Sequence, residues 1–339
     1  MNYLFKISVI IPCYNAEQFL DLALETLEHQ WDDKSFEMIF INDCSTDDTI
    51  NKLQEFCNRH PNNTQLIDKK TNEGVGQARN DGLSIARGEW ITFLDADDAL
   101  VDDSLRGMGE YFLSDDIDIL SFRTYIVNET ELQNKIKKAS QLQFSHDMIE
   151  WEGSGKDFFT KYLTNTCWMF CFKRQLIDKY NIKFKRMSYL EDSLFIMDNI
   201  LHDDVRVRRV TCRLHYWIRR NNDVNSLSSI SKNKKRNNRM IEDTVKALGY
   251  MQEAKNRTSE LHVANRIEWK QCDSGNVIIP LLLRCDMKVK DVLHLIKQLK
   301  SWNVYPYKNT KDKKNLFYNT LFRFPLLINT IRPIFNLTK

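Results

Sequence analysis

Three carboxylates directly follow a short apolar stretch near residue 95. Residues 90–94 are mostly apolar without polar alternation, which is typical of a strand buried on both faces. Asp95 and Asp97 are two residues apart, so in an extended chain both side chains project to one side and can hold one cation or polar ligand. Carboxylate oxygens without a nearby Cys or His suit Mg²⁺ or Mn²⁺. The alternative is that Asp95 to Asp98 only form a turn and a helix cap, and on these residues alone both interpretations stay open.

A second acidic pair lies well downstream. Glu191 and Asp192 precede an apolar pattern, Leu194 to Met197, that fits one face of a helix. Acids in the first turn of a helix are stabilised by the positive end of the helix dipole. Taken alone, this pair is more typical of such helix acids than of a catalytic group.

The elements that would position the first acids alternate along the chain. Apolar runs predict strands, and helical spacing of apolar residues predicts helices between them. The expected strands are 7–12, 37–43, 64–68 and 90–94, and the expected helices are 16–30, 47–60 and 77–86. Short connections between alternating strands and helices imply right-handed crossovers and a mainly parallel sheet with helices on both faces. We therefore expect an α/β, Rossmann-like fold.

Polar residues follow each expected strand, and in a parallel sheet they meet at one edge. They are the loop 12–15, Asp43, the loop 72–80 and Asp95 to Asp97. Ligands of open α/β sheets bind beyond the carboxyl ends of the strands, so this edge is the predicted binding site.

A nucleotide would find suitable partners at this edge. The Asp43 carboxylate can accept from a base N–H, and the backbone near Pro12 and Tyr14 can hold base or ribose. A metal at Asp97 can neutralise a diphosphate. Arg79 either adds positive charge for the ligand or only pairs with an acid.

Competing nucleotide motifs fit poorly. Gly74-Val75-Gly76 begins a GxGxxG-like string, but Arg79 occupies the third glycine position and the string follows the third strand instead of the first. The sequence has no GxxxxGK[ST] loop. These departures exclude dinucleotide-dependent dehydrogenases and P-loop proteins.

Composition indicates an ordinary globular protein. The chain has 339 residues, 42% of them hydrophobic, and a net charge of +3, which does not favour nucleic-acid binding. We see no secretory signal and no uncharged apolar run of bilayer length, and we expect the cysteines to be reduced. A cytoplasmic protein is therefore predicted.

Four segments, in this order, resemble the nucleotide-sugar domain of family 2 glycosyltransferases, which have the GT-A fold. The segments are Val9–Asn15, Ile41–Thr49, Asn72–Asn80 and Phe93–Asp98. The similarity is close over residues 5–105 and looser to about residue 230. One departure is Asn42-Asp43-Cys44, where the family more often has two acids followed by glycine; since the second acid is present, we expect little consequence.

The resemblance implies an inverting transferase that uses a nucleoside-diphosphate sugar and a divalent metal, Mn²⁺ or Mg²⁺. Asp43 would hold the base, by family habit uracil. Asp95-Ala96-Asp97 would be the DxD motif, with Asp97 as the direct metal ligand beside Asp95. The implied donor site contains Pro12, Tyr14, Asn15, Glu17, Asp43, Asn72, Gly74, Arg79, Asp95 and Ala96.

Two downstream segments also resemble family motifs. Glu191 and Asp192 match a catalytic Glu-Asp pair whose second acid is the general base that takes a proton from the acceptor hydroxyl. Residues 215–228 match a segment that closes over the diphosphate, which implies donor contacts from Arg219, Arg220 and Ser226. For either arginine taken singly, a solvated basic turn is an equal alternative.

Two ring side chains nearby are given structural interpretations. His215 is expected to be a structural histidine in preference to a metal ligand. Trp168 could stack on a sugar, but we favour packing in the core.

We predict a catalytic domain over residues 1–230, with a donor half to about 115 and an acceptor half from about 116, and a helical region over 231–339. The tail, 311–339, is basic, aromatic and amphipathic, and its prolines and arginines prevent it from spanning a bilayer. It either lies on an anionic membrane surface or docks onto the protein's own core or a partner chain, including a second copy.

Together these patterns predict a glycosyltransferase on the cytoplasmic side of the membrane that builds a surface or secreted glycan on a glycan or lipid-linked acceptor. One alternative is a sugar-nucleotide-binding protein without transfer activity, although every expected acid is present. Another is a nucleotidyltransferase of similar fold, which should carry a Gly-rich, Arg-containing loop where Pro12-Cys13-Tyr14-Asn15 stands.

Overall fold

The computed structural model describes residues 3–30, 35–128, 144–162, 165–220, 233–305 and 319–320. The chain divides into two compact units, one of Met1–Arg186 with Phe195–Asp223 and one of Met187–Leu194 with Val224–Lys339. The predicted domain boundary near residue 230 and nearly all of the tail 311–339 lie outside the described residues. Within the described ranges, no helix is both long and apolar enough to cross a bilayer.

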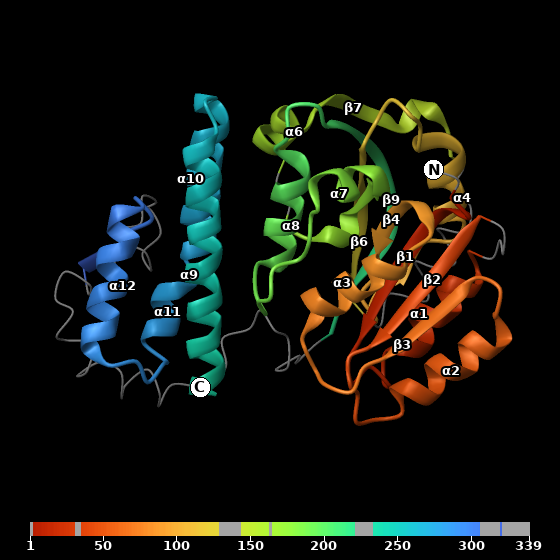
Figure 1. Ribbon diagram of the computed structural model, residues 1–339, viewed down its shortest axis with the longest axis horizontal. Coiled ribbons are helices and arrows are strands. Elements are labelled where there is room, and N and C mark those ends of the chain that lie inside the picture. Colours follow the sequence, from red (N-terminus) through yellow and green to blue (C-terminus); the bar gives the residue numbers. More distant parts are fainter. Residues whose placement is uncertain are drawn as a thin grey trace. The chain divides into compact units, whose positions relative to one another are not determined.

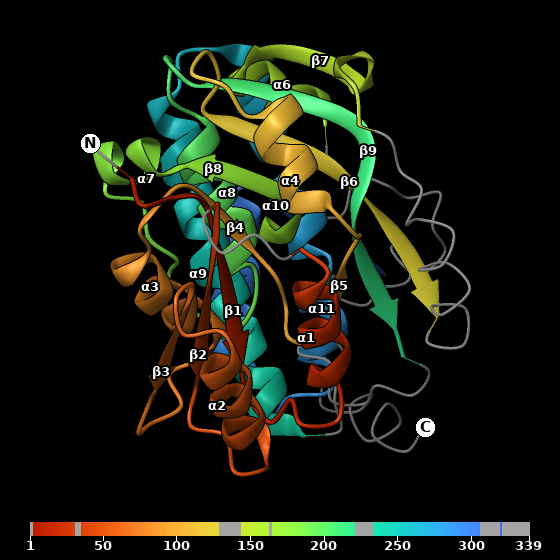
Figure 2. The same cartoon turned by 90° about the vertical axis from the view of Figure 1, so that its right-hand side faces the viewer.

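The first unit is built on a nine-stranded sheet (Figures 1 and 2). Its strands are β1 (Phe5–Cys13), β2 (Phe36–Asn42), β3 (Thr64–Asp68), β4 (Gly88–Phe93), β5 (Ala99–Leu100), β6 (Ile119–Asn128), β7 (Ile149–Ser154), β8 (Phe170–Lys173) and β9 (Arg206–Arg219). Its helices are α1 (Leu20–Glu28), α2 (Thr49–Arg59), α3 (Val75–Ile85), α4 (Ser104–Gly107), α6 (Gly155–Lys161), α7 (Arg174–Tyr180) and, from Phe195 on, α8 (Glu191–Ile200). Short turns of π-helix, η1 (Met108–Phe112), and 3-10 helix, η2 (His146–Met148) and η3 (Cys167–Met169), complete it.

The strand order is β3-β2-β1-β4-β8-β6-β9-β5, with β7 also pairing with β9. Strands β3, β2, β1 and β4 are parallel, as the alternation predicted. Beyond β4 the sheet is mixed, because β8 runs antiparallel to both β4 and β6 while β6 and β9 are parallel. The carboxyl ends of β1, β2, β3 and β4 therefore share one edge.

Helices cover both faces of the parallel strands, with α3 and α1 on opposite sides in Figure 2. On one face, alternate residues of β1 such as Val9 and Ile11 pack in a cluster with side chains of α1 and α2. On the other face, α3 lies so close that a Cβ added at Gly82 would be 2.6 Å from Ile10 Cγ2 and 2.9 Å from Ile41 Cδ1. This contact sets the distance between α3 and the sheet.

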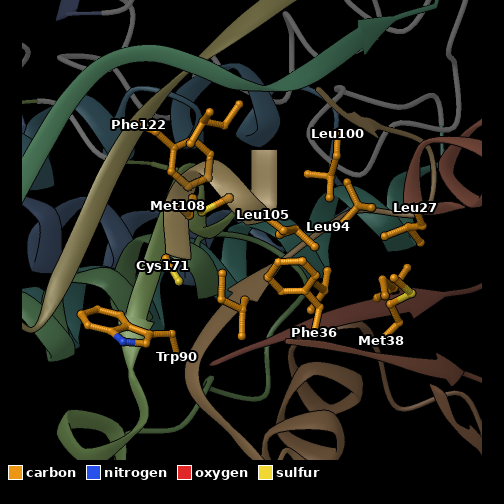
Figure 3. Close-up of a cluster of buried hydrophobic side chains, with 14 of the residues drawn as sticks. Leu27, Phe36, Met38, Trp90, Leu94, Leu100, Leu105, Met108, Phe122 and Cys171 are labelled. Carbon is orange, nitrogen blue, oxygen red and sulfur yellow. The ribbon is translucent and has the colours of Figure 1, made fainter. Parts of the chain in front are cut away.

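The main apolar core joins the two halves of the sheet (Figure 3). It contains Leu27 of α1, Phe36 of β2 and Trp90 of β4, and continues to Phe122 of β6 and Cys171 of β8. All are at most 2% exposed. Each large apolar side chain buried in this way contributes about 1.5–3 kcal/mol, so the core fixes the strands whose ends carry the polar loops.

The second unit is helical. Its helices are α9 (Lys234–Arg257), α10 (Leu261–Gly275), α11 (Ile278–Leu282) and α12 (Val289–Ser301). α9 and α10 form an antiparallel hairpin, since Lys255 pairs with Glu268 near the turn and Gln271 donates to the Leu248 carbonyl further along. The predicted helical character of the C-terminal region is confirmed for its described residues.

Candidate active site

The three carboxylates after β4 form one cluster. The chain turns there, with the Asp98 N–H donating to the Asp95 carbonyl at 3.0 Å. One ligand oxygen from each of Asp95, Asp97 and Asp98 lies within 4.8 Å of the others. The expectation that Asp95 and Asp97 project together from extended chain was therefore wrong in its local geometry, because a turn brings them together and adds Asp98.

Each carboxylate has its own partner. Arg79 donates to Asp95 Oδ1 at 2.8 Å and is 2% exposed, so the arginine pairs with an acid as one of its two interpretations foresaw. Arg220 donates to Asp97 Oδ2 at 3.1 Å and to the Asp97 carbonyl at 2.6 Å. The first contact joins α3 to the turn after β4, and the second joins segments 123 residues apart in the sequence.

Asp98 is a structural acid within this cluster. Its Oδ1 accepts from the Ile218 N–H at 3.0 Å, and its Oδ2 lies 3.4 Å from Nε2 of His215, which is fully buried. The His215 ring stacks on Trp168 at 4.3 Å, and Trp168 is only 6% exposed. Both rings therefore have the packed positions that the sequence favoured.

The electrostatics of the cluster are unusual at Asp97. Burial and repulsion from Asp98 and Asp95 raise the pKa of Asp97 to about 7, and Arg220 opposes that rise. Its side chain keeps 49% of its surface exposed, so water moderates the shift. An acid that resists ionisation beside two others marks a place where a cation would relieve charge repulsion.

The donor set fits a divalent metal. Asp95 and Asp97 offer carboxylate oxygens, the hard ligands that Mg²⁺ and Mn²⁺ prefer, and an oxygen of Asp98 lies within 4.8 Å of theirs. Within the described part of the chain this is the only group of three or more acidic, His or Cys side chains with that spacing. Ala96, between the two predicted ligands, is 8% exposed and offers the site only its backbone.

Asp43 organises the loop between β3 and α3. Its oxygens accept from the N–H groups of Glu73 at 3.0 Å and Gly74 at 2.8 Å, and Asn72 donates to its carbonyl at 3.2 Å. Gly74 has φ +89°, a conformation that favours glycine. Three predicted donor residues, Asp43, Asn72 and Gly74, are thus in direct contact. The backbone at Cys44 has φ +64°, a left-handed conformation that glycine adopts readily. This conformation explains why the family more often has glycine at that position.

Sequence reasoning missed Lys69. Its Nζ lies 3.1 Å from Asp43, 3.1 Å from Glu73 and 2.9 Å from Asp81, and its side chain is 7% exposed. Burial lowers the pKa of Lys69, but hydrogen bonds with Asp81, Asp43 and Glu73 outweigh it and the net pKa is raised. Only its place beside the Asn72–Asn80 segment could have indicated it.

The loop after β1 is tied to the loop after β2. Asn15, at φ +48°, donates from its N–H to Ser45 Oγ at 3.0 Å and accepts from the Thr46 N–H at 2.8 Å. Glu17 accepts from the N–H of Asp48 at 3.2 Å. These two predicted donor residues shape the loops and bring them to the carboxyl edge of the sheet.

Pro12 and Tyr14 lie on either side of the end of β1. Pro12 is in the strand, in register with Ile41 of β2. The Tyr14 side chain is 53% exposed at the edge where the predicted nucleotide would bind.

The two predicted arginines at the end of β9 have different surroundings. The Arg219 guanidinium lies 4.7 Å from the ring centre of Trp217, whereas Arg220 contacts the acid cluster. Ser226 lies outside the described residues. The structure thus distinguishes two neighbours that the sequence treated alike.

Glu191 and Asp192 occupy the first turn of α8, as predicted. Glu191 is 9% exposed, and the preceding Leu190 has φ +69°. Residues Met187–Leu194 group with the C-terminal helices, where the Ser188 N–H donates to Asp243 at 2.7 Å. The roles of Glu191 and Asp192 stay predictions.

Comparison with known proteins identifies the family. The family model described as "Glycosyl transferase family 2" matches residues 8–181, about half of the chain. The chain belongs to glycosyl transferase family 2. The resemblance found in the sequence motifs is thereby confirmed.

Curated relatives of this family 2 chain share part of its length. YibD of Escherichia coli K12, an uncharacterized glycosyltransferase, is 27% identical over 67% of this chain and 65% of its own. GgaA of Bacillus subtilis, a minor teichoic acid biosynthesis protein, is 33% identical over 40% of this chain and 32% of its own. TarS of Staphylococcus aureus, a poly(ribitol-phosphate) beta-N-acetylglucosaminyltransferase, is 32% identical over 37% of this chain and 22% of its own. The chain therefore matches less than two thirds of each relative's length.

Solved structures share the fold. TarS 1-349 in complex with UDP-GlcNAc has a TM-score of 0.55 and 19% identity, and the similarity covers 94% of this chain and 92% of that one. The mannosyltransferase PcManGT of Pyrobaculum calidifontis, in complex with GDP-Man and Mn²⁺, has a TM-score of 0.51 and 15% identity over 97% and 87% of the two chains. The GT-A fold predicted from the sequence is confirmed.

Proposed function

We propose that this family 2 chain is an inverting glycosyltransferase that transfers a sugar from a UDP-sugar to a hydroxyl of a glycan or lipid-linked acceptor in surface polysaccharide biosynthesis. The observation that carries the proposal is the cluster of Asp95, Asp97 and Asp98 at the carboxyl edge of the sheet in a GT-A fold. The UDP-GlcNAc bound to TarS and the teichoic acid role in the name of GgaA support this class of donor and acceptor.

The loops at the carboxyl edge would bind the donor. Each carboxylate oxygen of Asp43 accepts one hydrogen bond from a backbone N–H. A carboxylate oxygen has a further lone pair, which can accept from the base. The exposed ring of Tyr14 and the backbone near Pro12 would contact base or ribose. Asn15, Glu17, Asn72 and Gly74 would act by holding these loops in place, and Arg219, Arg220 and Ser226 would contact the diphosphate.

The acid cluster would serve the departing diphosphate. Asp97, with Asp95, would hold Mn²⁺ or Mg²⁺, which when bound takes up charge on the leaving group. Arg79 keeps Asp95 oriented through a 2.8 Å hydrogen bond. Asp98 fixes the turn by accepting from the Ile218 N–H.

Asp192 would be the general base, with Glu191 beside it. An acceptor hydroxyl must lose its proton as it attacks the anomeric carbon, and a positioned carboxylate can take it. The proposal for Asp192 is supported by its match to the family's Glu-Asp motif and its place in the first turn of α8.

The tail and the cell compartment complete the proposal. Residues 311–339, basic and amphipathic in sequence, would hold the enzyme at the cytoplasmic face of the cell membrane, where lipid-linked acceptors are available.

The test is release of the nucleoside diphosphate from a panel of nucleotide sugars, with Mn²⁺ or with EDTA. We expect one or a few UDP-sugars to react, and EDTA or Asp97→Asn to abolish the reaction. Asp192→Asn should lower transfer on the order of 10²- to 10⁴-fold while UDP binding is kept. The matched control is Asp198→Asn in the same helix, whose side chain pairs with Lys185 and is 42% exposed. Turnover that is unchanged by EDTA, or full activity of Asp192→Asn, would contradict the mechanism.

A further inference from the structure

The guanidinium of Arg220 is held from two sides. It donates to Asp97 through Nη1 to Oδ2 at 3.1 Å and through Nη2 to the backbone carbonyl at 2.6 Å. Its carbon Cζ lies 4.1 Å from the ring centre of Phe19, the residue before α1, which is the distance of a close cation–π contact. The Arg220 side chain is only 12% exposed, so this is a packed position and not a loose surface pair.

Arg220 also completes the charge balance of the cluster. Asp95 is paired with Arg79, and Asp98 accepts from a backbone N–H and faces His215. Arg220 places a cationic side chain on Asp97, with Nη1 at 3.1 Å from Oδ2. A divalent ion that binds Asp97 therefore meets an oxygen already engaged by an arginine.

We propose that Arg220 is the internal counter-cation of the metal site: it occupies Asp97 in the metal-free protein and releases it when metal and nucleoside diphosphate bind. The inference rests on the proposed function, since it takes Asp97 as a metal ligand. The metal and Arg220 are both positive and compete for the Asp97 carboxylate. When the diphosphate binds, Arg220 can pair with its oxygens and leave Asp97 to the metal.

The chemistry of arginine suits this exchange. The planar guanidinium fork binds carboxylate and phosphate oxygens with similar geometry, so the same group can pass from Asp97 to a diphosphate. The Phe19 ring stabilises the guanidinium through its face and leaves its edge N–H groups available to either anion. Phe19 thereby keeps the arginine near the cluster in both states.

The experiment measures binding of Mn²⁺ alone to the purified full chain without donor, by electron paramagnetic resonance of the free ion. Arg220→Gln removes the competitor and should bind Mn²⁺ about two- to fivefold more tightly, the range for loss of an ion pair whose carboxylate is 49% exposed. Phe19→Leu keeps the charge of Arg220 but removes the aromatic ring that holds the guanidinium beside Asp97, so it should tighten Mn²⁺ binding about twofold. The matched control is Arg213→Gln in β9, the strand that Arg220 directly follows. The Arg213 guanidinium lies over Tyr125, and this substitution should leave Mn²⁺ affinity unchanged.

A second measurement, UDP binding in saturating Mn²⁺, should move the opposite way: Arg220→Gln should bind UDP about tenfold more weakly. Simple damage to the site would weaken both ligands, so the opposite signs identify the exchange. Equal or weaker Mn²⁺ binding by Arg220→Gln overturns the proposal, as does equal tightening in Arg213→Gln, which would show a general charge effect. If Arg220→Gln does not fold, unchanged Mn²⁺ affinity in Phe19→Leu overturns it. Absence of Mn²⁺ binding by the wild-type chain would instead remove the metal from the proposed function.

Discussion

Two glycines in helix interiors should respond in opposite ways to alanine. Gly82 in α3 faces the sheet, and its added Cβ would lie 2.6 Å from Ile10 Cγ2 and 2.9 Å from Ile41 Cδ1. Gly249 in α9 would place its Cβ no closer than 3.8 Å, from a ring atom of Trp302. Both substitutions gain helix propensity of about 1 kcal/mol, so the difference between them reports packing alone.

At Gly82 the packing cost should exceed this gain. Ile10 is β-branched and buried, so its Cγ2 cannot rotate away and α3 must move off the sheet. Overpacking of this kind costs typically 1–3 kcal/mol, for a net loss of up to about 2 kcal/mol. In a unit of roughly 200 residues this lowers the melting temperature by up to about 8 °C, whereas Gly249→Ala should be neutral or raise it slightly.

The assay is thermal unfolding followed by circular dichroism, together with hydrogen exchange to assign each transition to its unit. Because Arg79 lies one turn before Gly82 on α3 and pairs with Asp95, displacement of the helix should also weaken Mn²⁺ binding in Gly82→Ala. A Gly82→Ala protein that melts at or above the wild-type temperature would refute the close packing of α3.

Three further predictions concern ligands. The raised pKa of Asp97, about 7, means that this carboxyl holds its proton below that pH and loses it above, so Mn²⁺ affinity measured by titration should fall as pH drops through 7, by up to about tenfold per unit; a flat profile from pH 8 to 5.5 would contradict it. Lys69→Met leaves Asp43 without its cation and should raise the KM for the nucleotide sugar about tenfold at unchanged kcat. The Lys70 side chain is 86% exposed, so Lys70→Met should change neither KM nor kcat. The full chain should float with anionic liposomes and a chain ending at Lys308 should not; equal flotation of the two would exclude membrane contact through the tail.

Local patterns predicted the parallel half of the sheet well. β3 was expected over residues 64–68 and spans Thr64–Asp68, and β2 was expected over 37–43 and spans Phe36–Asn42. Buried strands read as continuous apolar runs, and turn residues mark their ends, so both signals are present within a few residues of chain. The convergence of the polar loops then followed from parallel topology alone.

The contacts that define the site could not be predicted in this way. The pairs Arg79–Asp95 and Arg220–Asp97 join residues on different elements, and nothing local distinguishes Arg220 from Arg219. The order β8-β6-β9 beyond β4 likewise depends on pairing between distant segments. Even Asp95 was placed for the wrong local reason, because extended geometry was assumed where the chain turns.

The hydrogen bond from the Ile218 N–H to Asp98 has a consequence for protein engineering. It ties the acidic turn to the end of β9, so residues 95–98 and 215–220 behave as one exchange unit although more than a hundred positions separate them. The donor is a backbone N–H that every residue except proline supplies, so a chimera keeps this bond only if the transplanted turn has an acid at position 98. A turn without that acid would lose the bond and shift the arginine beside it. Recombination that moves residues 95–98 and 215–220 together would preserve the hydrogen bond and the position of Arg220.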